Sequence, residues 1–532
     1  MRFLLSINDF LIMRVFLSFF LLSLIGLCSF SSAGQESDLR KGEVFLNLEQ
    51  ALESQFSQET TTYVIEDVLD LNGRTVAVPY GCSLRFLPSG DLTNGTLILD
   101  DTELIDAHGL SCNLKGTVSN ESIYSSWFCS LDNIELDFNE KTFYFDTDTQ
   151  VSKGLHFSNV HHAVFDGQGH TIENPSCTFL SIGENCTDIE VRNFICTGDG
   201  EGAFFAGSSS RGEKKNIIIH DNKISHQRLG ISLNADLDGK YSNCAIYGNT
   251  IRDISGENPG HGYGIHLANI EHCVIRDNII ENCDRHSIYH AWGNHNTISG
   301  NTIRNHRANV PFNLRAAVAI YRNSHHVRIE NNLFENGCSM DIHLNASPDG
   351  STARSEERDG NQYGIMIARN RFIHNKQLPS AECMGIMVGY NVLSYEDTRY
   401  YVEEVRISDN YFEYCNTNAS TAIRSYLCKN LTVKGNTFVF DSATNGNLVF
   451  LSAKYSEGAE SKWAIVRNSF VARGIFGASK NAIYLDPAFK QGLGKYKLRI
   501  QNNALENSKV SASQYNYRAL SLYGVEGVRQ RD

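Results

Sequence analysis

The sequence is poor in features that mark several common folds and sites. It has 8 prolines and 3 tryptophans in 532 residues, and its 14 cysteines form no Cys-x-x-Cys pair. A cysteine-ligated zinc site is therefore not expected. Outside the N-terminal region no apolar run is long enough to span a membrane. A net charge of -13 leaves no broad basic face for a nucleic acid. The 42 glycines and many asparagines instead indicate a turn-rich β protein.

The N-terminus has the pattern of an export signal. After Met13, a basic Arg14 is followed by an apolar run from Val15 to Leu27 and by small residues ending at Ala33. Residues 1–33 are therefore predicted to be a signal peptide, with Met1 and Met13 both open as the start. The run is too short for a membrane anchor. We expect an exported bacterial protein that is periplasmic, cell-surface or secreted.

A short motif recurs ten times along the chain: an apolar residue, two residues, Asn, one residue, and a second apolar residue. The asparagines are Asn222, Asn249, Asn278, Asn301, Asn332, Asn370, Asn410, Asn436, Asn468 and Asn503. The alternation predicts short strands with one buried face. Asn tolerates a left-handed backbone, so we expect it at a corner, with its amide stacked on those of neighbouring coils. The sequence predicts an all-β, right-handed parallel β-helix. Leucine is too rare at the required places for leucine-rich repeats.

This solenoid is expected to form one domain over 34–532. Residues 34–160 would provide an N-terminal cap and early coils, and 161–510 the regular coils. The amphipathic segment 43–56 is predicted to be a capping helix that covers the open end. Cys244, Cys273, Cys283 and Cys415 stand at fixed distances from ladder asparagines, which predicts small side chains stacked in the core.

A second strand precedes each Asn motif and presents polar residues outward. Aligning these strands gives an outward row of Ser232, His266, Tyr289, Tyr321 and His343. His290 and Arg322 follow this row, at a position that strict alternation would bury. For His290 two positions stay open: it is a satisfied core residue, or it lines a cleft. Arg322 is expected to line a cleft, because burying an unpaired guanidinium is costly.

The region around this row has an unusual charge. Residues 285–328 contain six Arg and six His but no Asp, Glu or Lys. At the chain's overall frequency about five acids would be expected there. Such a segment forms either an ordinary surface of corner loops or a groove whose positive potential attracts a polyanion. The coincidence with the His/Tyr row favours the groove.

The leader, the Asn-rich coils and the basic His/Tyr/Arg face resemble the parallel β-helix polysaccharide lyases of the broad pectate-lyase-like group. That resemblance implies β-elimination on a uronic-acid polymer such as a glycosaminoglycan, alginate or pectin. His266 or His290 would be the base, Tyr289 or Tyr321 the acid, and Arg315 or Arg322 the carboxylate clamp. Substrate-binding residues would be Arg285, His286, Trp292, His343, Arg354 and Arg358.

The chain departs from the lyases that use lysine as the base, since it has no lysine between Lys240 and Lys376. No cofactor is certain, although Asp236 and Asp238 are candidates for a calcium site. We expect a monomer. Three alternatives stay open: a C5-epimerase, a non-catalytic carbohydrate-binding spike, and a glycoside hydrolase. "GHGYGIH" (260–266) is similar to the Gly-His-Gly of β-helix polygalacturonases, but the paired aspartates expected upstream are missing.

Overall fold

The computed structural model describes residues 43–46, 56, 58–207, 212–235, 239–256, 261–307, 316–346, 360–377, 384–389, 401–419, 421–426, 428–441, 448–451, 461–473, 482–485 and 496–506. The chain divides into the units Met1–Val44 and Phe45–Asp532, and the features below concern the second, apart from Glu43 and Val44 at the start of strand β1. The predicted signal peptide lies outside the described residues, as do Arg315, Arg354, Arg358, Asp236 and Asp238. The described part of the chain has no helix that could traverse a membrane.

The first coils are built from short strands and two 3-10 turns. They are β1 (Glu43–Phe45), β2 (Thr62–Ile65), β3 (Val68–Asp70), β4 (Thr75–Ala77), β5 (Ser83–Phe86), β6 (Asp91–Thr93), β7 (Thr96–Ile105), β8 (Asn113–Val118), η1 (Ser125–Trp127), η2 (Leu131–Asn133) and β10 (Ile134–Leu136). The helix predicted over 43–56 is wrong at its start, where β1 stands; 47–55 lie outside the described residues. The Leu46 backbone N–H donates to Val64 O at 3.0 Å, so strand pairing outweighs the amphipathic pattern.

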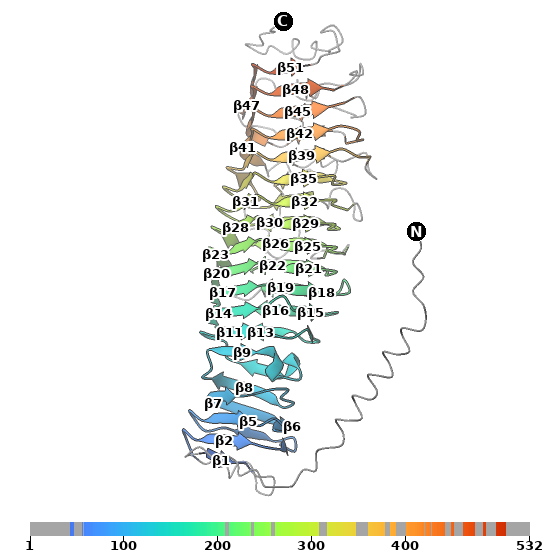
Figure 1. Ribbon diagram of the computed structural model, residues 1–532. Coiled ribbons are helices and arrows are strands. Elements are labelled where there is room, and N and C mark those ends of the chain that lie inside the picture. Colours follow the sequence, from blue (N-terminus) through green and yellow to red (C-terminus); the bar gives the residue numbers. More distant parts are fainter. Residues whose placement is uncertain are drawn as a thin grey trace, which may run out of the picture. The chain divides into compact units, whose positions relative to one another are not determined.

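From Ser122 onward the coils build three parallel sheets, which Figure 1 shows stacked in chain order from cyan to red. Sheet I contains β9 (Ser122–Tyr124), β11 (Thr142–Tyr144), β14 (His161–Asp166), β17 (Thr187–Arg192), β20 (Gly212–His220), β23 (Gly239–Ser242), β24 (Ala245–Tyr247), β27 (Ile270–Glu271), β28 (Val274–Arg276), β31 (Thr297–Ser299), β34 (Arg328–Glu330), β37 (Gln362–Tyr363), β38 (Met366–Ala368), β41 (Val402–Ser408), β44 (Cys428–Lys434), β47 (Ser461–Val466) and β50 (Tyr496–Gln501).

Sheet II contains β12 (Thr149–Gln150), β15 (Thr171–Glu173), β18 (Ile195–Thr197), β21 (Lys223–Ser225), β25 (Thr250–Arg252), β29 (Ile279–Glu281), β32 (Thr302–Arg304), β35 (Leu333–Glu335), β39 (Arg371–His374), β42 (Tyr411–Tyr414), β45 (Thr437–Phe440), β48 (Ser469–Ala472) and β51 (Ala504–Glu506). Sheet III contains β13 (Leu155–Phe157), β16 (Thr178–Ile182), β19 (Ala203–Gly207), β22 (Leu229–Asn234), β26 (Tyr263–Ala268), β30 (His286–Ala291), β33 (Ala316–Tyr321), β36 (Met340–Asn345), β40 (Met384–Val388), β43 (Thr421–Ser425), β46 (Val449–Leu451) and β49 (Ile483–Leu485).

The predicted asparagine ladder is confirmed over all ten copies. In each step the side-chain amide and the backbone N–H of one Asn both donate to the side-chain oxygen of the next, at 2.9–3.1 Å. From Asn222 to Asn436 every ladder asparagine is at most 1% exposed. The row is therefore an internal spine in which buried amides satisfy one another.

The left-handed backbone lies one residue earlier than predicted. The residue before each ladder asparagine has a positive φ, such as 55° at Asp277 and 68° at Gly300, whereas none of the ten asparagines does. The turn is therefore made by the preceding residue, and the Asn amide is free to bridge coils. The sequence contains Gly, Asp or Asn at most of these positions, the residues that tolerate this conformation best.

Connection lengths differ between the corners of the coil. From β17–β18 to β50–β51 the corner between sheets I and II has two residues, the left-handed residue and the one after it. The connections that flank sheet III vary: four residues separate β29 from β30 and eleven separate β32 from β33. Sixteen residues separate β36 from β37. Length variation therefore concentrates at the two edges of sheet III.

The core is apolar and continuous through the coils. Ile and Phe of sheets I and II stack in register, and Phe334, Phe372, Phe412, Phe438 and Phe470 form one such column with ring centroids 4.5–4.9 Å apart. The twelve cysteines among the described residues are all free thiols. Those predicted to stack in the core, Cys244, Cys273, Cys283 and Cys415, are all buried, as expected.

Candidate functional site

The outer face of sheet III carries the polar row that the sequence predicts, with one register error. The residues that align across successive strands are Ser232, His266, Tyr289, Ala319 and His343. Tyr321 was predicted at the place of Ala319, but it lies two residues further along β33 and aligns with Ala291 and Asn345. A shift of two keeps a side chain on the same face.

Tyr321 nevertheless completes the row. Its ring centroid lies 5.4 Å from that of Tyr289 and 5.4 Å from that of His343, because Ala319 between them is small. The Tyr321 hydroxyl lies 3.3 Å from His343 Nδ1. His343 is 0% exposed and Tyr321 is half-buried, so a buried imidazole orients the phenol of a partly accessible residue.

His266 is a half-buried imidazole in the same cluster. Its Nδ1 lies 3.2 Å from Ser232 Oγ, and its ring lies 5.2 Å from both Tyr263 and Tyr289. Burial lowers the pKa of His266 to about 4, and the positive charge of Arg322 adds to the effect. At neutral pH this imidazole is therefore uncharged and able to accept a proton.

Arg322 and Trp292 form the charged side of the cluster. The Arg322 guanidinium lies 4.2 Å from the centroid of the Trp292 ring, within the range of a cation–π interaction. Both residues have a left-handed backbone, with φ of 58° and 50°, just past the ends of their strands. The strand alternation ends before them, and both side chains are half-buried rather than in the core.

Three other predicted site residues are buried. His290 is 0% exposed, with Nδ1 3.2 Å from Ser324 Oγ and Nε2 3.0 Å from Asn296 Nδ2. It aligns with Leu267 and Ile320 of the core, so His290 occupies a core position rather than lining a cleft. His286 (1% exposed) and Arg285 (8% exposed) both contact the Tyr263 ring. The His286 ring also packs against Tyr289 and Tyr321, at 5.4 and 5.8 Å, so it lies within the cluster. Burial lowers the pKa of His286 well below its ordinary value.

A buried histidine–carboxylate contact between β39 of sheet II and β36 of sheet III was missed by the sequence analysis. His374 Nε2 lies 2.8 Å from Asp341 Oδ2, and both residues are at most 1% exposed. Burial raises the pKa of Asp341, and His374 opposes that effect. A signal was available, because His374 aligns with Tyr414 and Phe440 in an otherwise aromatic row.

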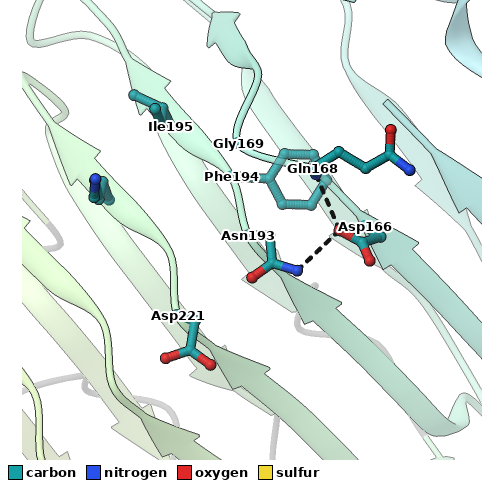
Figure 2. A pocket seen from close by; sticks show the side chains of 8 residues that line it. Asp166, Gln168, Gly169, Asn193, Phe194, Ile195 and Asp221 are labelled. Carbon is teal, nitrogen blue, oxygen red and sulfur yellow. Dashed lines mark hydrogen bonds between the residues drawn. The ribbon is translucent and has the colours of Figure 1, made fainter. Parts of the chain in front are cut away.

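A second polar region lies at the corner of sheets I and II. An open pocket of about 430 Å³ is lined by Asp166, Gln168, Asn193, Asp221 and Lys223, among others. Figure 2 shows Asp166 accepting hydrogen bonds from the Gln168 backbone and the Asn193 amide, with Asp221 nearby. Burial would raise the pKa of Asp166, but these bonds and the Arg192 guanidinium hold it below its ordinary value.

A stack of three imidazoles, also missed, runs along the outside of sheet I. The ring centroids of His272 and His295 are 5.1 Å apart, and those of His295 and His326 are 4.7 Å apart. Each histidine stands six residues before its ladder asparagine, at 278, 301 and 332 respectively, and this spacing was the available signal.

Two family models match parts of the chain. One, described as a right handed beta helix region, matches residues 240–394. The chain is a right-handed parallel β-helix. A second model, described as NosD, a periplasmic copper-binding protein, matches residues 131–315. No curated protein matches the chain. These matches support the predicted β-helix fold, but they do not support a relation to the polysaccharide lyases.

Several solved structures are similar to the chain at low sequence identity. A GH136 lacto-N-biosidase from Eubacterium ramulus is 12% identical with a TM-score of 0.46, and 67% of each chain is covered. A mutant tailspike protein of E. coli bacteriophage HK620, in complex with a pentasaccharide, is 13% identical with a TM-score of 0.43, covering 69% of this β-helix and 60% of the tailspike. A GH87 alpha-1,3-glucanase from Streptomyces thermodiastaticus is 13% identical with a TM-score of 0.40, covering 69% and 63%.

Proposed function

We propose that this β-helix cleaves an anionic, uronate-containing polysaccharide by β-elimination on the outer face of sheet III. The observation that carries the proposal is the cluster of His266, Tyr289, Tyr321 and His343 beside Arg322. It combines an uncharged imidazole, phenol hydroxyls and a guanidinium on one face. Those are the three groups that elimination from a uronate requires.

In the proposed reaction, His266 removes the proton from C5 of the uronate. The electron pair of that C–H bond forms the C4–C5 double bond, and the glycosidic oxygen leaves C4 with a proton from a tyrosine hydroxyl. Tyr321, half-buried and oriented by His343, is the preferred acid, and Tyr289 is the other candidate. Arg322 neutralises the uronate carboxylate, which favours loss of the C5 proton.

The remaining candidates take supporting roles in this proposal. Trp292 holds Arg322 and offers a ring face to a sugar. The buried Arg285, His286 and His343 act as positioning residues rather than as contacts with the polymer. His290 is left out of the reaction because both of its ring nitrogens face core partners. Arg315, Arg354 and Arg358 remain proposed substrate contacts on segments outside the described residues.

Hydrolysis is the second candidate, and one observation favours it. Asp166 and Asp221 line the pocket between sheets I and II, and hydrolases use two carboxylates across the scissile bond. Along the described strands from β22 to β40, sheet III carries one carboxylate, Asp341, and it is buried with His374. Elimination on sheet III and hydrolysis at the Asp166 pocket are therefore separable by mutation.

Export is part of the same proposal. It is supported by the N-terminal pattern of residues 1–33 and by the match to a family described as periplasmic. Polysaccharides of this kind are found outside the cytoplasm, so a monomeric exported enzyme would meet its substrate there.

The test follows ultraviolet absorbance and reducing ends in parallel, with purified protein and a panel of uronate polysaccharides. Elimination raises both signals, because each cleavage creates a carbon–carbon double bond. We expect His266→Ala, Tyr321→Phe and Arg322→Gln each to lower turnover by about a hundredfold or more. His170→Ala and Tyr80→Phe change side chains away from sheet III, half-buried at His170 and exposed at Tyr80, and serve as controls.

Two outcomes would overturn the proposal. Reducing ends without absorbance, lost in Asp166→Asn or Asp221→Asn, would establish hydrolysis at the other pocket. Binding without turnover of any polymer would indicate a carbohydrate-binding spike. It would be read from a change in tryptophan fluorescence that the Trp292→Phe variant abolishes.

A further inference from the structure

The imidazole stack on sheet I includes a carboxylate at one end. Glu271, His272 and His295 each offer one ligand atom, and these atoms all lie within 4.8 Å of one another. His272 Nε2 lies 3.4 Å from Glu271 Oε1. The other carboxylate oxygen of Glu271, Oε2, contacts the ammonium group of Lys240. One oxygen is therefore held by a cation while the other faces the imidazoles.

The backbone explains why the rings converge. His272, His295 and His326 have φ of 55°, 54° and 51°, so each occupies the same left-handed turn in successive coils. The flanking bridges Glu271–Asn294 and Asn294–His325 keep those coils in parallel register. Equivalent side chains of neighbouring coils are stacked about 4.8 Å apart. The fold thus fixes the distance between the two imidazole rings, a distance that cannot be read from the sequence.

We propose that Glu271, His272 and His295 bind one divalent transition-metal ion of the class that prefers imidazole, with Zn²⁺ as its simplest member. Two imidazole nitrogens and a carboxylate oxygen form an established three-ligand set for zinc, and water supplies the fourth ligand. This site is separate from the proposed elimination chemistry on sheet III, and neither proposal depends on the other.

The distances between the three ligand atoms are close to those of a tetrahedral zinc site. Metal–ligand bonds of about 2.0–2.2 Å in a tetrahedral site place ligand atoms roughly 3.3–3.6 Å apart. The three ligand atoms lie within 4.8 Å, and the side chains of His272 and Glu271 are 54% and 24% exposed. Closing this difference requires the side chains to rotate, and their exposure to solvent leaves room for that rotation. The Lys240 ammonium stays on the outer oxygen and orients the carboxylate.

The stack itself provides a matched control. His326 has the same left-handed backbone and lies 4.7 Å from His295, but its ring also packs against Tyr363 at 5.0 Å, and the residue before it is His325 rather than a carboxylate. It is not one of the three convergent ligands. Its replacement should therefore affect the metal much less than replacement of His295.

The test is calorimetric titration of the full, tag-free chain with Zn²⁺ alone, followed by thermal unfolding with and without Zn²⁺. We expect one saturable site with a dissociation constant of about 10 µM or lower. His272→Ala, His295→Ala and Glu271→Gln should each weaken binding at least about tenfold. His326→Ala and His170→Ala should stay within about threefold of the unchanged chain.

Three results would overturn the proposal. These are no saturable binding, binding unchanged in the His272→Ala/His295→Ala double variant, or an equal loss in His170→Ala. Circular dichroism of each variant verifies that the coils remain folded. Because Zn²⁺ binding is measured without any polysaccharide, a failed metal site leaves the elimination proposal standing, and the reverse also holds.

Discussion

Replacing one asparagine of the internal spine should destabilise its coil strongly. Asn301 is 0% exposed and makes five side-chain hydrogen bonds. Its oxygen accepts from the backbone and the side chain of Asn278, at 3.1 and 2.9 Å. Its amide donates to Ile275 O, Ser299 O and Asn332 Oδ1, at 3.0–3.2 Å.

The magnitude follows from these bonds. A buried hydrogen bond contributes about 1 kcal/mol net, and leaving a buried donor without its acceptor costs about 1–3 kcal/mol. Asn301→Ala removes five bonds and leaves the Asn278 N–H without its Asn301 acceptor, so we expect a loss of about 3–5 kcal/mol. At 1.4 kcal/mol per factor of ten, local opening should become at least about a hundredfold more frequent.

Hydrogen exchange, measured by mass spectrometry on peptides covering 275–303, reports directly how often this coil opens. The control is Asn113→Ala on β8, an exposed asparagine with one long 3.4 Å bond to Thr96, where the change should stay within about 0.5 kcal/mol. If Asn301→Ala leaves exchange in these peptides within threefold of the unchanged chain, the spine does not stabilise the coils and the reasoning is wrong. If exchange in Asn301→Ala becomes faster only in peptides of neighbouring coils, the loss of stability is transmitted to those coils rather than local.

Two further predictions concern pH. His290 has its pKa lowered by burial from 6.5 to about 4, so its contribution to stability is present above pH 6.5 and is lost as the pH falls through about 4. We expect His290→Gln to flatten the fall in urea midpoint between pH 7 and pH 4.5 by the equivalent of about 2–3 kcal/mol, and an unchanged slope would contradict the assignment. If His266 is the base, the acidic limb of kcat/KM should lie near pH 4. Arg322→Gln should move that limb upward but not to 6.5, because burial is the larger cause; a limb unmoved in this variant would remove Arg322 from the site.

The sequence predicted the repeat better than it predicted the placement of individual side chains. The Asn period gave the coils and the spine, because one residue type at one corner repeats without interruption. The segment Ala316–Tyr321 is apolar at almost every position, so alternation could not fix its register, and the alignment slipped by two residues. The slip preserved the face, which is why Tyr321 still joins Tyr289 and His343.

Other features were invisible because they depend on packing between coils. The left-handed residue precedes the ladder asparagine, since the amide must be free to reach the next coil. His374 pairs with Asp341 across 33 positions. The aromatic row of Tyr414 and Phe440 marks His374 as unusual, but the local pattern contains no information about its partner. The three histidines of the imidazole stack are seen to be equivalent only when each is counted back six residues from the ladder asparagine of its coil.

The constant two-residue corner between sheets I and II has a consequence for how such a chain can change. Because each coil is anchored there by the spine, a segment inserted at either edge of sheet III does not shift the strands that follow it. Natural variation, or deliberate loop grafting, is therefore free to alter the surroundings of the His266–Tyr321 cluster coil by coil. A single scaffold of this type can acquire a new ligand by exchanging segments at one face, while the opposite corner preserves the register.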